Sequence, residues 1–247
     1  MRKLDLAAIA RMLEGLEETI IYKLIDRAQF RHNPRIYQPG KSGFAGAKKQ
    51  SLFEIRLRYQ ERMDAEFGRF SVPEERPFNR HLPRPRRAAA LPPTGLFIAD
   101  YDIVNLTTQI TACYLQLIPR ICRKGADGHF GSSTEHDVYA IQAIARRIHY
   151  GAFYVAESKY RGAPKTYQRL IDHGDERGLL DVLTRLEVED RIIARVRAKV
   201  AAAQARVDAK LRNVVDPRLV IALYRDHIIP LTKEGEIRYL LNRKNPQ

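Results

Sequence analysis

The chain has 247 residues, of which 45% are hydrophobic and 29% are charged, an ordinary composition for a folded globular protein. No apolar stretch reaches the roughly 18 residues needed to cross a membrane. The N-terminal residues include acids where a signal peptide has an uninterrupted apolar run. We therefore expect a cytoplasmic protein without membrane contact. The formal net charge of +14 makes anionic small molecules and nucleic acids candidate partners.

The distribution of the basic residues argues against nucleic acid. Lysines and arginines are spread along the chain, with no long basic block, zinc-finger spacing or aromatic RNP-type signature. A basic nucleic-acid-binding protein is therefore the remote alternative. The seven histidines show no HxxxH or Cys/His spacing, so we expect no metal site. Cys113 and Cys122 are predicted to be buried, reduced thiols.

Apolar residues recur at helical spacing through most of the chain, and strand-like alternation is nearly absent. In the first segment they are Leu6, Ile9, Leu13, Leu16, Ile20 and Leu24, which predicts a helix over residues 5–30. The same pattern predicts helices over residues 47–70, 102–122, 134–160, 164–173, 176–212, 217–228 and 231–243. Prolines 164, 217 and 230 fit first-turn positions. The predicted fold is an all-α bundle of long helices.

A proline-rich stretch interrupts this pattern. Six of the 13 prolines lie between Pro73 and Pro93, which predicts a loop over residues 71–95. The stretch also holds five arginines: Arg76, Arg80, Arg84, Arg86 and Arg87. We expect a solvated surface loop, with polyanion binding as the alternative. Because we find no internal repeat and no long linker, residues 1–247 are predicted to form a single domain.

Several charged side chains lie within apolar segments. The stretch ARRIHYGAFYVAESKY, residues 145–160, places Arg147, Glu157 and Lys159 among apolar residues. Two further pairs lie one helical turn apart: Arg185 with Glu189, and Thr232 with Glu236. These charges either face solvent or face inward onto a ligand. An unpaired buried charge is costly, and in a helical bundle an inward-facing set of such residues can converge from several helices on one central pocket.

Three sequence blocks carry a family resemblance. RRIHYGAFYVAESKY, LEETIIYKLIDRAQF near the start and IIPLTKEGEIRYLL near the end resemble, in order and spacing, the fungal and plant chorismate mutases. The resemblance covers nearly the whole chain and is poor at residues 31–45 and in the proline-rich stretch. It implies an all-helical homodimer with one active site inside each subunit and no cofactor. The family rearranges chorismate to prephenate in aromatic amino acid biosynthesis.

The resemblance also implies a role for each candidate site residue. Chorismate carries two carboxylates, and negative charge builds on its ether oxygen in the transition state. Arg147 would clamp a carboxylate, and Lys159 would bond the ether oxygen and a carboxylate. Glu236, in its protonated form, would be the second donor to the ether oxygen. Glu189 would accept a hydrogen bond from the ring hydroxyl, and Thr232 would contact a carboxylate.

The chain departs from the family at the second carboxylate clamp. Ala10 occupies the position of the family's arginine on the first helix, and Arg185 stands where the family has an asparagine. We predict that Arg185 binds substrate in place of the missing arginine. Arg11, next to Ala10, and Lys3, seven residues before it, are the alternatives. The vacancy also leaves open a related anionic substrate, or a fold that retains binding without catalysis.

The spacing between the two central cations differs as well. Arg147 and Lys159 are twelve residues apart, where the family pattern is eleven. On a regular helix, twelve residues leave the two side chains about 120° apart. A single π-bulge near Gly151 would absorb the extra residue. Without such a bulge, the insertion would indicate a lost site.

The regulatory site implied by the resemblance is incomplete. Fungal members bind tyrosine or tryptophan between subunits. Of that site, Arg69, Gly131 and Ser132 are present here. Gly68 replaces a second arginine, and Glu135 stands where the family has a threonine. We expect this degenerate allosteric site to bind amino acids poorly.

Overall fold

The computed structural model describes residues 4–87 and 90–244, and within them it contains helices and turns but no strand. The all-α prediction is confirmed. The helices are α1 (Leu6–Ala28), α2 (Leu52–Glu66), α3 (Thr107–Ile121), α4 (Phe130–Tyr150), α5 (Ala156–Gly162), α6 (Pro164–Asp172), α7 (Glu176–Leu183), α8 (Leu186–Gln204), α9 (Pro217–Leu223) and α10 (Ile229–Leu241). Among these helices, none is long and apolar enough to span a bilayer.

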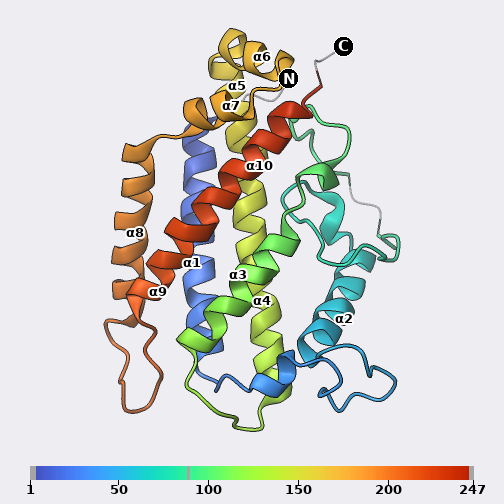
Figure 1. The fold of residues 1–247 in the computed structure, drawn as a ribbon, viewed down its shortest axis with the longest axis vertical. Helices are drawn as coiled ribbons and strands as arrows, with labels where there is room; N and C mark the ends of the chain where they lie inside the picture. The colour runs from blue at the N-terminus through green and yellow to red at the C-terminus, as the bar shows by residue number, and fades with distance from the viewer. Residues whose placement is uncertain (1–3, 88–89, 245–247) are drawn as a thin grey trace.

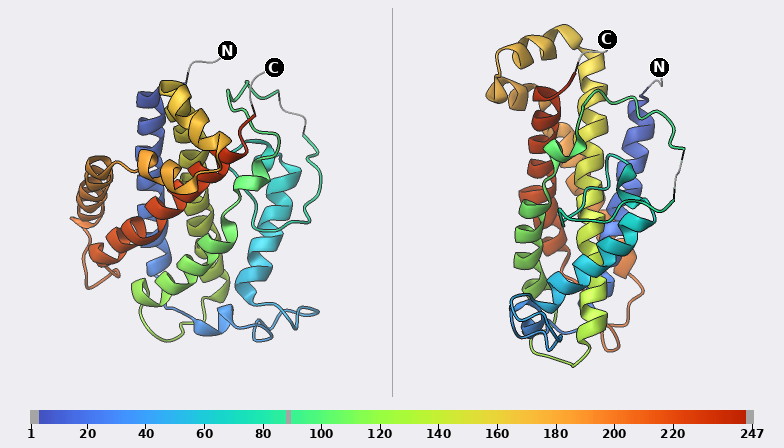
Figure 2. Two further views of the ribbon diagram at one scale, coloured as in Figure 1. Left: turned by 45° about the horizontal axis from the view of Figure 1, so that its top comes forward. Right: turned by 90° about the vertical axis from the view of Figure 1, so that its right-hand side faces the viewer.

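The helices form an elongated bundle around α1 and α4, which pack against each other. In Figure 1, α3 and α10 cross in front of this pair, α8 lies at its left and α2 at its right. The short helices α5, α6 and α7 gather at the end of the bundle where both termini lie (Figures 1 and 2).

The core follows the predicted helical spacing and has two parts. Ile20 of α1, Tyr114 of α3 and Ile144 of α4 belong to the larger cluster. Phe153 and Tyr239 belong to a second cluster around α5, α6, α7 and α10. Cys113 and Cys122 are free and buried, as predicted, and burial raises the pKa of each thiol to about 11.

The single helix predicted over residues 176–212 is wrong. The chain leaves the helical conformation at Thr184 and Arg185, so that α7 and α8 are separate. The Leu180 carbonyl accepts from both the Thr184 backbone N–H, at 3.0 Å, and the Thr184 hydroxyl, at 2.8 Å, at the point where α7 ends. Helix α8 ends at Gln204, eight residues before the predicted end.

The two helices predicted over residues 217–228 and 231–243 are instead one continuous rod. Helix α9 passes through a π-turn, Tyr224–Ile228, into α10. Pro230 follows this turn directly. A proline inside an α-helix cannot donate to the fourth residue before it and its ring crowds that carbonyl. The wider π-turn accommodates both effects, so proline does not end the helix here.

The proline-rich loop is anchored at several points, which include the backbone N–H groups of Phe78 and Asn79 on the buried Glu61 carboxylate and the buried side chain of Arg76. Arg76 is 7% exposed and donates to the carbonyls of Phe70, Val72 and Pro73 and to the Asp102 carboxylate. The expectation of a solvated loop is therefore wrong for Arg76. The other four arginines of the stretch are exposed. Residues 88–89 lie outside the described residues.

The crossing of α10 over the π-turn that follows α4 depends on Gly235. A Cβ atom added to Gly235 would lie 2.5 Å from the Cβ of Ala152 and 3.2 Å from Cδ1 of Leu106. Neither helix can yield without moving its backbone. We expect Gly235→Ala to lower the free energy of unfolding by about 1–3 kcal/mol. For a chain of this size the melting temperature should fall by about 3–10 °C.

A second helical glycine provides the control. Around Gly15 of α1 there is no atom within 4 Å of an added Cβ. Gly15→Ala should raise stability by up to about 1 kcal/mol, because alanine has the higher helix propensity. Thermal unfolding of both variants tests the pair. If the Gly235→Ala protein were as stable as the unmodified one, α10 and the π-turn after α4 could move apart at this crossing without loss of stability.

Candidate functional site

Arg147, near the C-terminal end of α4, is the most unusual charged residue of the bundle. The residue is 3% exposed, and two of its guanidinium nitrogens, Nε and Nη1, are buried without a hydrogen-bond partner. Burial lowers the pKa of the guanidinium. Gly151 makes room for it, since an added Cβ there would lie 3.2 Å from Arg147 Nη1 and 2.7 Å from Thr232 Cγ2. Buried donors are normally hydrogen-bonded, and the described residues supply no partner to these two nitrogens.

Three residues that the sequence analysis did not select surround Arg147. Glu17 of α1 is fully buried and accepts a hydrogen bond from Arg195 of α8 at 2.6 Å. The Tyr224 hydroxyl is buried without a partner, and the nearby Arg147 charge opposes the rise in its pKa that burial causes. Glu17 had a detectable signal, because it lies one turn after Leu13 on the apolar face of α1.

Lys159 and Glu236 form the second part of the site. The Lys159 ammonium lies 2.9 Å from a carboxylate oxygen of Glu236 and donates to the Leu183 carbonyl at 3.0 Å. Glu236 is 4% exposed, and burial raises the pKa of its carboxyl. The positive charges of Lys159, Arg147 and Lys233 oppose that rise. The carboxyl thus lies among three cations.

A π-turn accommodates the twelve-residue spacing between Arg147 and Lys159. Residues Gly151–Val155 form this turn between α4 and α5, at the position the spacing requires, so the predicted π-bulge is confirmed. The extra residue is absorbed, and the charges of both Arg147 and Lys159 act on the one carboxyl of Glu236. The insertion therefore does not separate the two cations.

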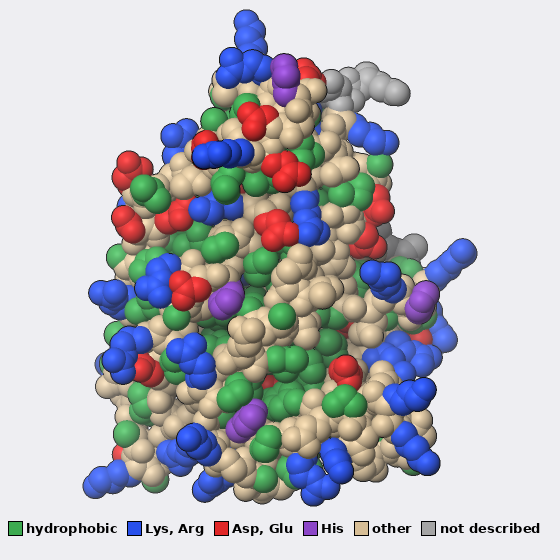
Figure 3. All heavy atoms as spheres, in the orientation of Figure 1, with side chains coloured by type: hydrophobic (Ala, Val, Ile, Leu, Met, Phe, Trp, Pro, Cys, Tyr) green, Lys and Arg blue, Asp and Glu red, His purple; other side chains and the backbone are tan. Residues whose placement is uncertain are grey.

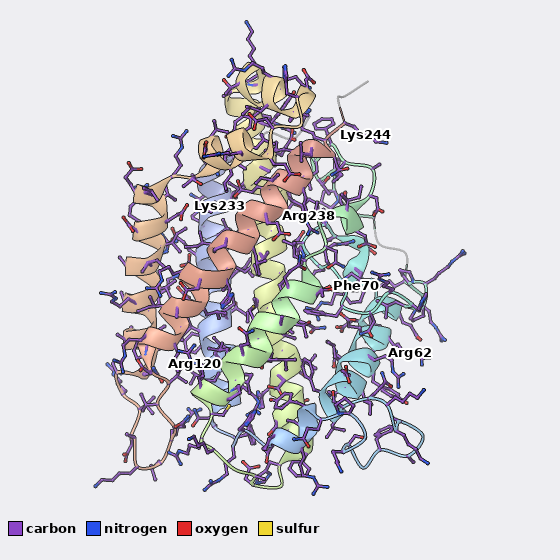
Figure 4. All side chains as sticks on the ribbon, in the orientation of Figure 1. Arg62, Phe70, Arg120, Lys233, Arg238 and Lys244 are labelled. Atoms are coloured by element: carbon purple, nitrogen blue, oxygen red, sulfur yellow. The ribbon has the colours of Figure 1, made fainter. Side chains whose placement is uncertain are left out.

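Thr232 and Glu189 border this cluster. Thr232 is buried on α10 and its hydroxyl donates to the Ile228 carbonyl at 2.6 Å. Glu189 of α8 accepts from Lys233 of α10 at 3.0 Å. Figure 4 shows Lys233 and Arg238 at successive positions along α10. Lys233 is a further site residue that the sequence analysis did not select.

Arg185 and Arg11 lie outside the buried cluster. Arg185 is exposed at the junction of α7 and α8 instead of one turn from Glu189 within a single helix. Burial raises the pKa of the Tyr167 hydroxyl, the Glu236 charge adds to this rise, and the Arg185 charge opposes it. Arg185 therefore lies near the Glu236 end of the site. Ala10 and Arg11 are both exposed on α1. Lys3 lies outside the described residues.

The two charged residues at the predicted regulatory site, Arg69 and Glu135, already have partners within this chain. Arg69 pairs with Asp64 at 2.8 Å and with Glu75 at 3.0 Å. Glu135 pairs with Arg56 at 3.0 Å. Gly68 has a φ angle of 84°, in the left-handed region that an arginine would adopt only with strain. Gly131 and Ser132 lie in the first turn of α4.

A cavity of about 660 Å³ lies elsewhere, between the end of α2, the proline-rich loop and the start of α3. Phe70, labelled in Figure 4, is one of its lining residues. None of the predicted substrate-site residues lines it, and all three guanidinium nitrogens of its buried cation, Arg76, are hydrogen-bonded. No group of three or more His, Cys, Asp or Glu side chains within residues 4–87 and 90–244 could hold a metal ion.

The fold matches solved structures over almost the whole chain. Aro7p chorismate mutase from Candida albicans, in complex with L-Trp, superposes with a TM-score of 0.89 at 34% identity, covering 97% of this chain and 92% of that one. AtCM1 with phenylalanine in its allosteric site gives a TM-score of 0.87 at 36% identity, covering 97% and 96%.

Sequence relatives agree with the structures. Chorismate mutase of Schizosaccharomyces pombe is 34% identical over 248 residues, covering 98% of this chain and 97% of that protein. This chain belongs to the chorismate mutase family. The chloroplastic chorismate mutase 1 of Petunia hybrida is 36% identical, covering 96% of this chain and 75% of that protein. No family model matches the chain. The buried cations described above are therefore those of a chorismate mutase family member.

Proposed function

We propose that this chain is an isomerase that rearranges chorismate to prephenate in aromatic amino acid biosynthesis, without a cofactor. The observation that carries the proposal is the Arg147 guanidinium, buried with two unbonded nitrogens. A buried cation without partners is costly unless a ligand anion completes it. A planar fork of donors suits a carboxylate, and chorismate has two.

Lys159 and Glu236 supply the groups that the transition state needs. Their mutual contact at 2.9 Å gives way when a substrate carboxylate takes Lys159 as its partner. Substrate charge then favours the protonated form of the buried Glu236. The neutral acid and the ammonium both donate to the ether oxygen, where charge builds as the C–O bond breaks and the C–C bond forms. Donors held in place for this charge stabilise the transition state more than the ground state.

Glu189 and Thr232 complete the proposed contacts. Glu189 would exchange its bond with Lys233 for one from the ring hydroxyl, and Thr232 would contact a carboxylate. Together with Arg147, these contacts would hold the reactive chair conformer, which contributes part of the rate.

Turnover of chorismate by the purified protein tests the proposal. Disappearance of chorismate with stoichiometric appearance of prephenate is the expected result. Binding without turnover would favour the same fold acting on a related anion or retaining binding alone. Either outcome would agree with Ala10 at the position of the family's arginine. Neither binding nor turnover would overturn the assignment.

We also propose that Arg185 replaces part of the charge missing at Ala10. Because Arg185 is exposed, it acts through attraction at the rim and not through a buried clamp. Arg185→Asn should raise KM about two- to fivefold at low salt, with little change in kcat, and added salt should reduce the difference. Arg197→Asn, the same charge change at an exposed position of α8, is the control. A larger effect of Arg11→Ala than of Arg185→Asn would assign the role to Arg11.

Weak regulation is a further expectation. Arg69 and Glu135 have partners, and Gly68 supplies no guanidinium. An added carboxylate at Glu135 disfavours the carboxylate of an amino acid. We expect tryptophan, tyrosine and phenylalanine at millimolar concentration to leave the rate within about twofold. A several-fold change in the chorismate saturation curve would contradict this expectation.

The assembly and location are proposed on similar grounds. Tyr59 and Met63 on α2 and Phe67 directly after it are 51%, 47% and 69% exposed at four-residue spacing, an apolar surface suited to a homodimer. Sedimentation equilibrium tests the dimer. A cytoplasmic location is supported by a maize relative named as cytosolic, 33% identical over 98% of this chain. On the face in Figure 3 the basic side chains are dispersed among acidic ones, which does not favour nucleic acid.

A further inference from the structure

A second buried charge cluster lies beside the Lys159–Glu236 pair. Glu157 is fully buried on α5, and its Oε2 accepts from the Tyr239 hydroxyl at 2.7 Å and from Arg243 Nε at 2.8 Å. Its Oε1 accepts from Arg161 Nε at 2.7 Å. Glu157 is thus the common acceptor for two arginines and a tyrosine.

This cluster joins three segments that are distant in sequence. The Arg243 guanidinium lies 3.6 Å from the ring centre of Tyr160 and 5.0 Å from that of Phe97. The backbone N–H of Phe97 donates to the Tyr239 hydroxyl at 3.0 Å, and that of Lys244 donates to the Phe97 carbonyl at 2.8 Å. Helix α5, the end of α10 and the segment around Phe97 therefore meet at one carboxylate.

Helix α5 needs such a contact. It has seven residues, continues from α4 through the π-turn and ends at Gly162, because the backbone of Ala163 is not helical. The π-turn shifts the side-chain positions of α5 relative to those of α4, so contacts with other segments decide how α5 lies against α10. Lys159 lies two residues from Glu157 on α5, and Glu236 lies three residues from Tyr239 on α10. The two pairs are neighbouring cross-links between the same helices.

We propose that Glu157 is a positioning residue, which holds the Lys159 ammonium against Glu236 by tying α5 to Tyr239 and Arg243. The inference rests on the proposed function. Without the carboxylate, two arginines lose their common acceptor and α5 loses its cross-link to the end of α10. Lys159 then moves relative to the carboxyl that it faces.

The pH dependence of activity separates positioning from general damage. Glu236 is faced by Lys159 on α5, Arg147 on α4, Lys233 on α10 and Tyr167 on α6. Lys159 is the cation in contact, and its charge lowers the pKa of Glu236. In Glu157→Gln we expect kcat to fall at least about tenfold, as for a misplaced catalytic group. The loss of activity at high pH should move to higher pH, because Glu236 keeps its proton longer.

Asp137→Asn is the matched control. Asp137 is likewise fully buried and accepts from Arg27, Tyr37 and Tyr114, but it lies on α4, three helical turns from Arg147. This variant should be less stable, but the fall of its activity at high pH should stay at the same pH as in the unmodified protein. Tyr239→Phe removes one of the bonds to Glu157, together with the acceptor of the Phe97 N–H, and keeps both arginines on the carboxylate. It should shift the fall of activity at high pH in the same direction by less, which keeps the test available if Glu157→Gln unfolds.

An independent measurement distinguishes failure of the inference from failure of the proposed function. The titration of Glu236, followed by carbon-13 NMR without substrate, should move upward in Glu157→Gln whether or not the unmodified protein turns over chorismate. The positioning role would be overturned if Glu157→Gln left both the Glu236 titration and the high-pH fall of activity unchanged, and lost activity only in proportion to the fraction of unfolded protein.

Discussion

Replacing Arg147 with methionine is expected to abolish most of the activity while leaving the fold at least as stable. Methionine keeps much of the apolar stem and removes the charge. The substrate carboxylate would then be buried without its partner, at a cost of about 3–5 kcal/mol. This corresponds to a decrease in kcat/KM of roughly 10²- to 10⁴-fold.

The stability of this variant is the more discriminating measurement. The Arg147 guanidinium has two nitrogens without hydrogen bonds, so its removal relieves a desolvation cost in the free protein. Urea unfolding should give an unchanged or higher free energy of unfolding. Such a trade between stability and activity is expected where a site is built for an absent ligand.

Arg27→Met provides the opposite case. Arg27 is also fully buried, but it pairs with Asp137 at 2.6 Å and donates to the Tyr37 hydroxyl at 2.9 Å. Its loss leaves Asp137 without its cation, which should cost about 3–5 kcal/mol. Equal destabilisation by Arg147→Met would mean that Arg147 is a structural cation and not an anion site.

The comparison of these two arginines shows what sequence alone could predict. Periodicity places α1, α4 and most other helices within a few residues, because each has one face that must be buried. The same pattern cannot distinguish Arg27 from Arg147, since both lie on buried helix faces. Only the partners differ, and these come from distant segments.

Helix continuity was the least predictable feature of the fold. Pro230 indicates a break, yet the rod continues because the preceding π-turn widens the helix. Thr184 and Arg185 contain no breaking residue, yet the chain bends there. In both cases local backbone geometry decides, and the residue types alone do not specify it. The π-turn at Gly151 was predictable because a known spacing had to be restored.

The site illustrates a similar division. Arg147, Lys159, Glu236 and Thr232 could be selected from their spacing and the family resemblance. Arg185 was placed by assuming one helix across residues 176–212, and the junction leaves its side chain exposed. The role inferred for Glu157 could not be read from the sequence, because its partners Tyr239 and Arg243 follow it by more than 80 residues.

The pH dependence of the unmodified protein should be dominated by Glu236. The proposed donor to the ether oxygen is the protonated carboxyl, which is present below its pKa and lost as pH rises through it. Burial raises that pKa, so the fall begins at higher pH than for an exposed glutamate. Above it, kcat/KM should fall about tenfold per pH unit.

Glu236→Gln should remove this fall. The glutamine amide donates at every pH, so activity should stay level on the alkaline side and exceed that of the unmodified protein there. Two pH units above the pKa the difference approaches about 100-fold if the amide donates as well as the acid. Glu234→Gln is the control, because Glu234 is the nearby α10 acid that pairs with Arg238 away from the site at 2.5 Å. That variant should keep the alkaline fall.

The two kinetic parameters should also differ in the unmodified protein. The profile of kcat/KM reports the free enzyme, in which Lys159 contacts Glu236 and lowers the pKa of its carboxyl. The profile of kcat reports the complex, in which a substrate carboxylate takes Lys159 and adds negative charge nearby. The fall in kcat should therefore lie at higher pH than the fall in kcat/KM. A Glu236→Gln protein that retains the alkaline fall in both parameters would exclude Glu236 as the donor and direct attention to Lys159 alone.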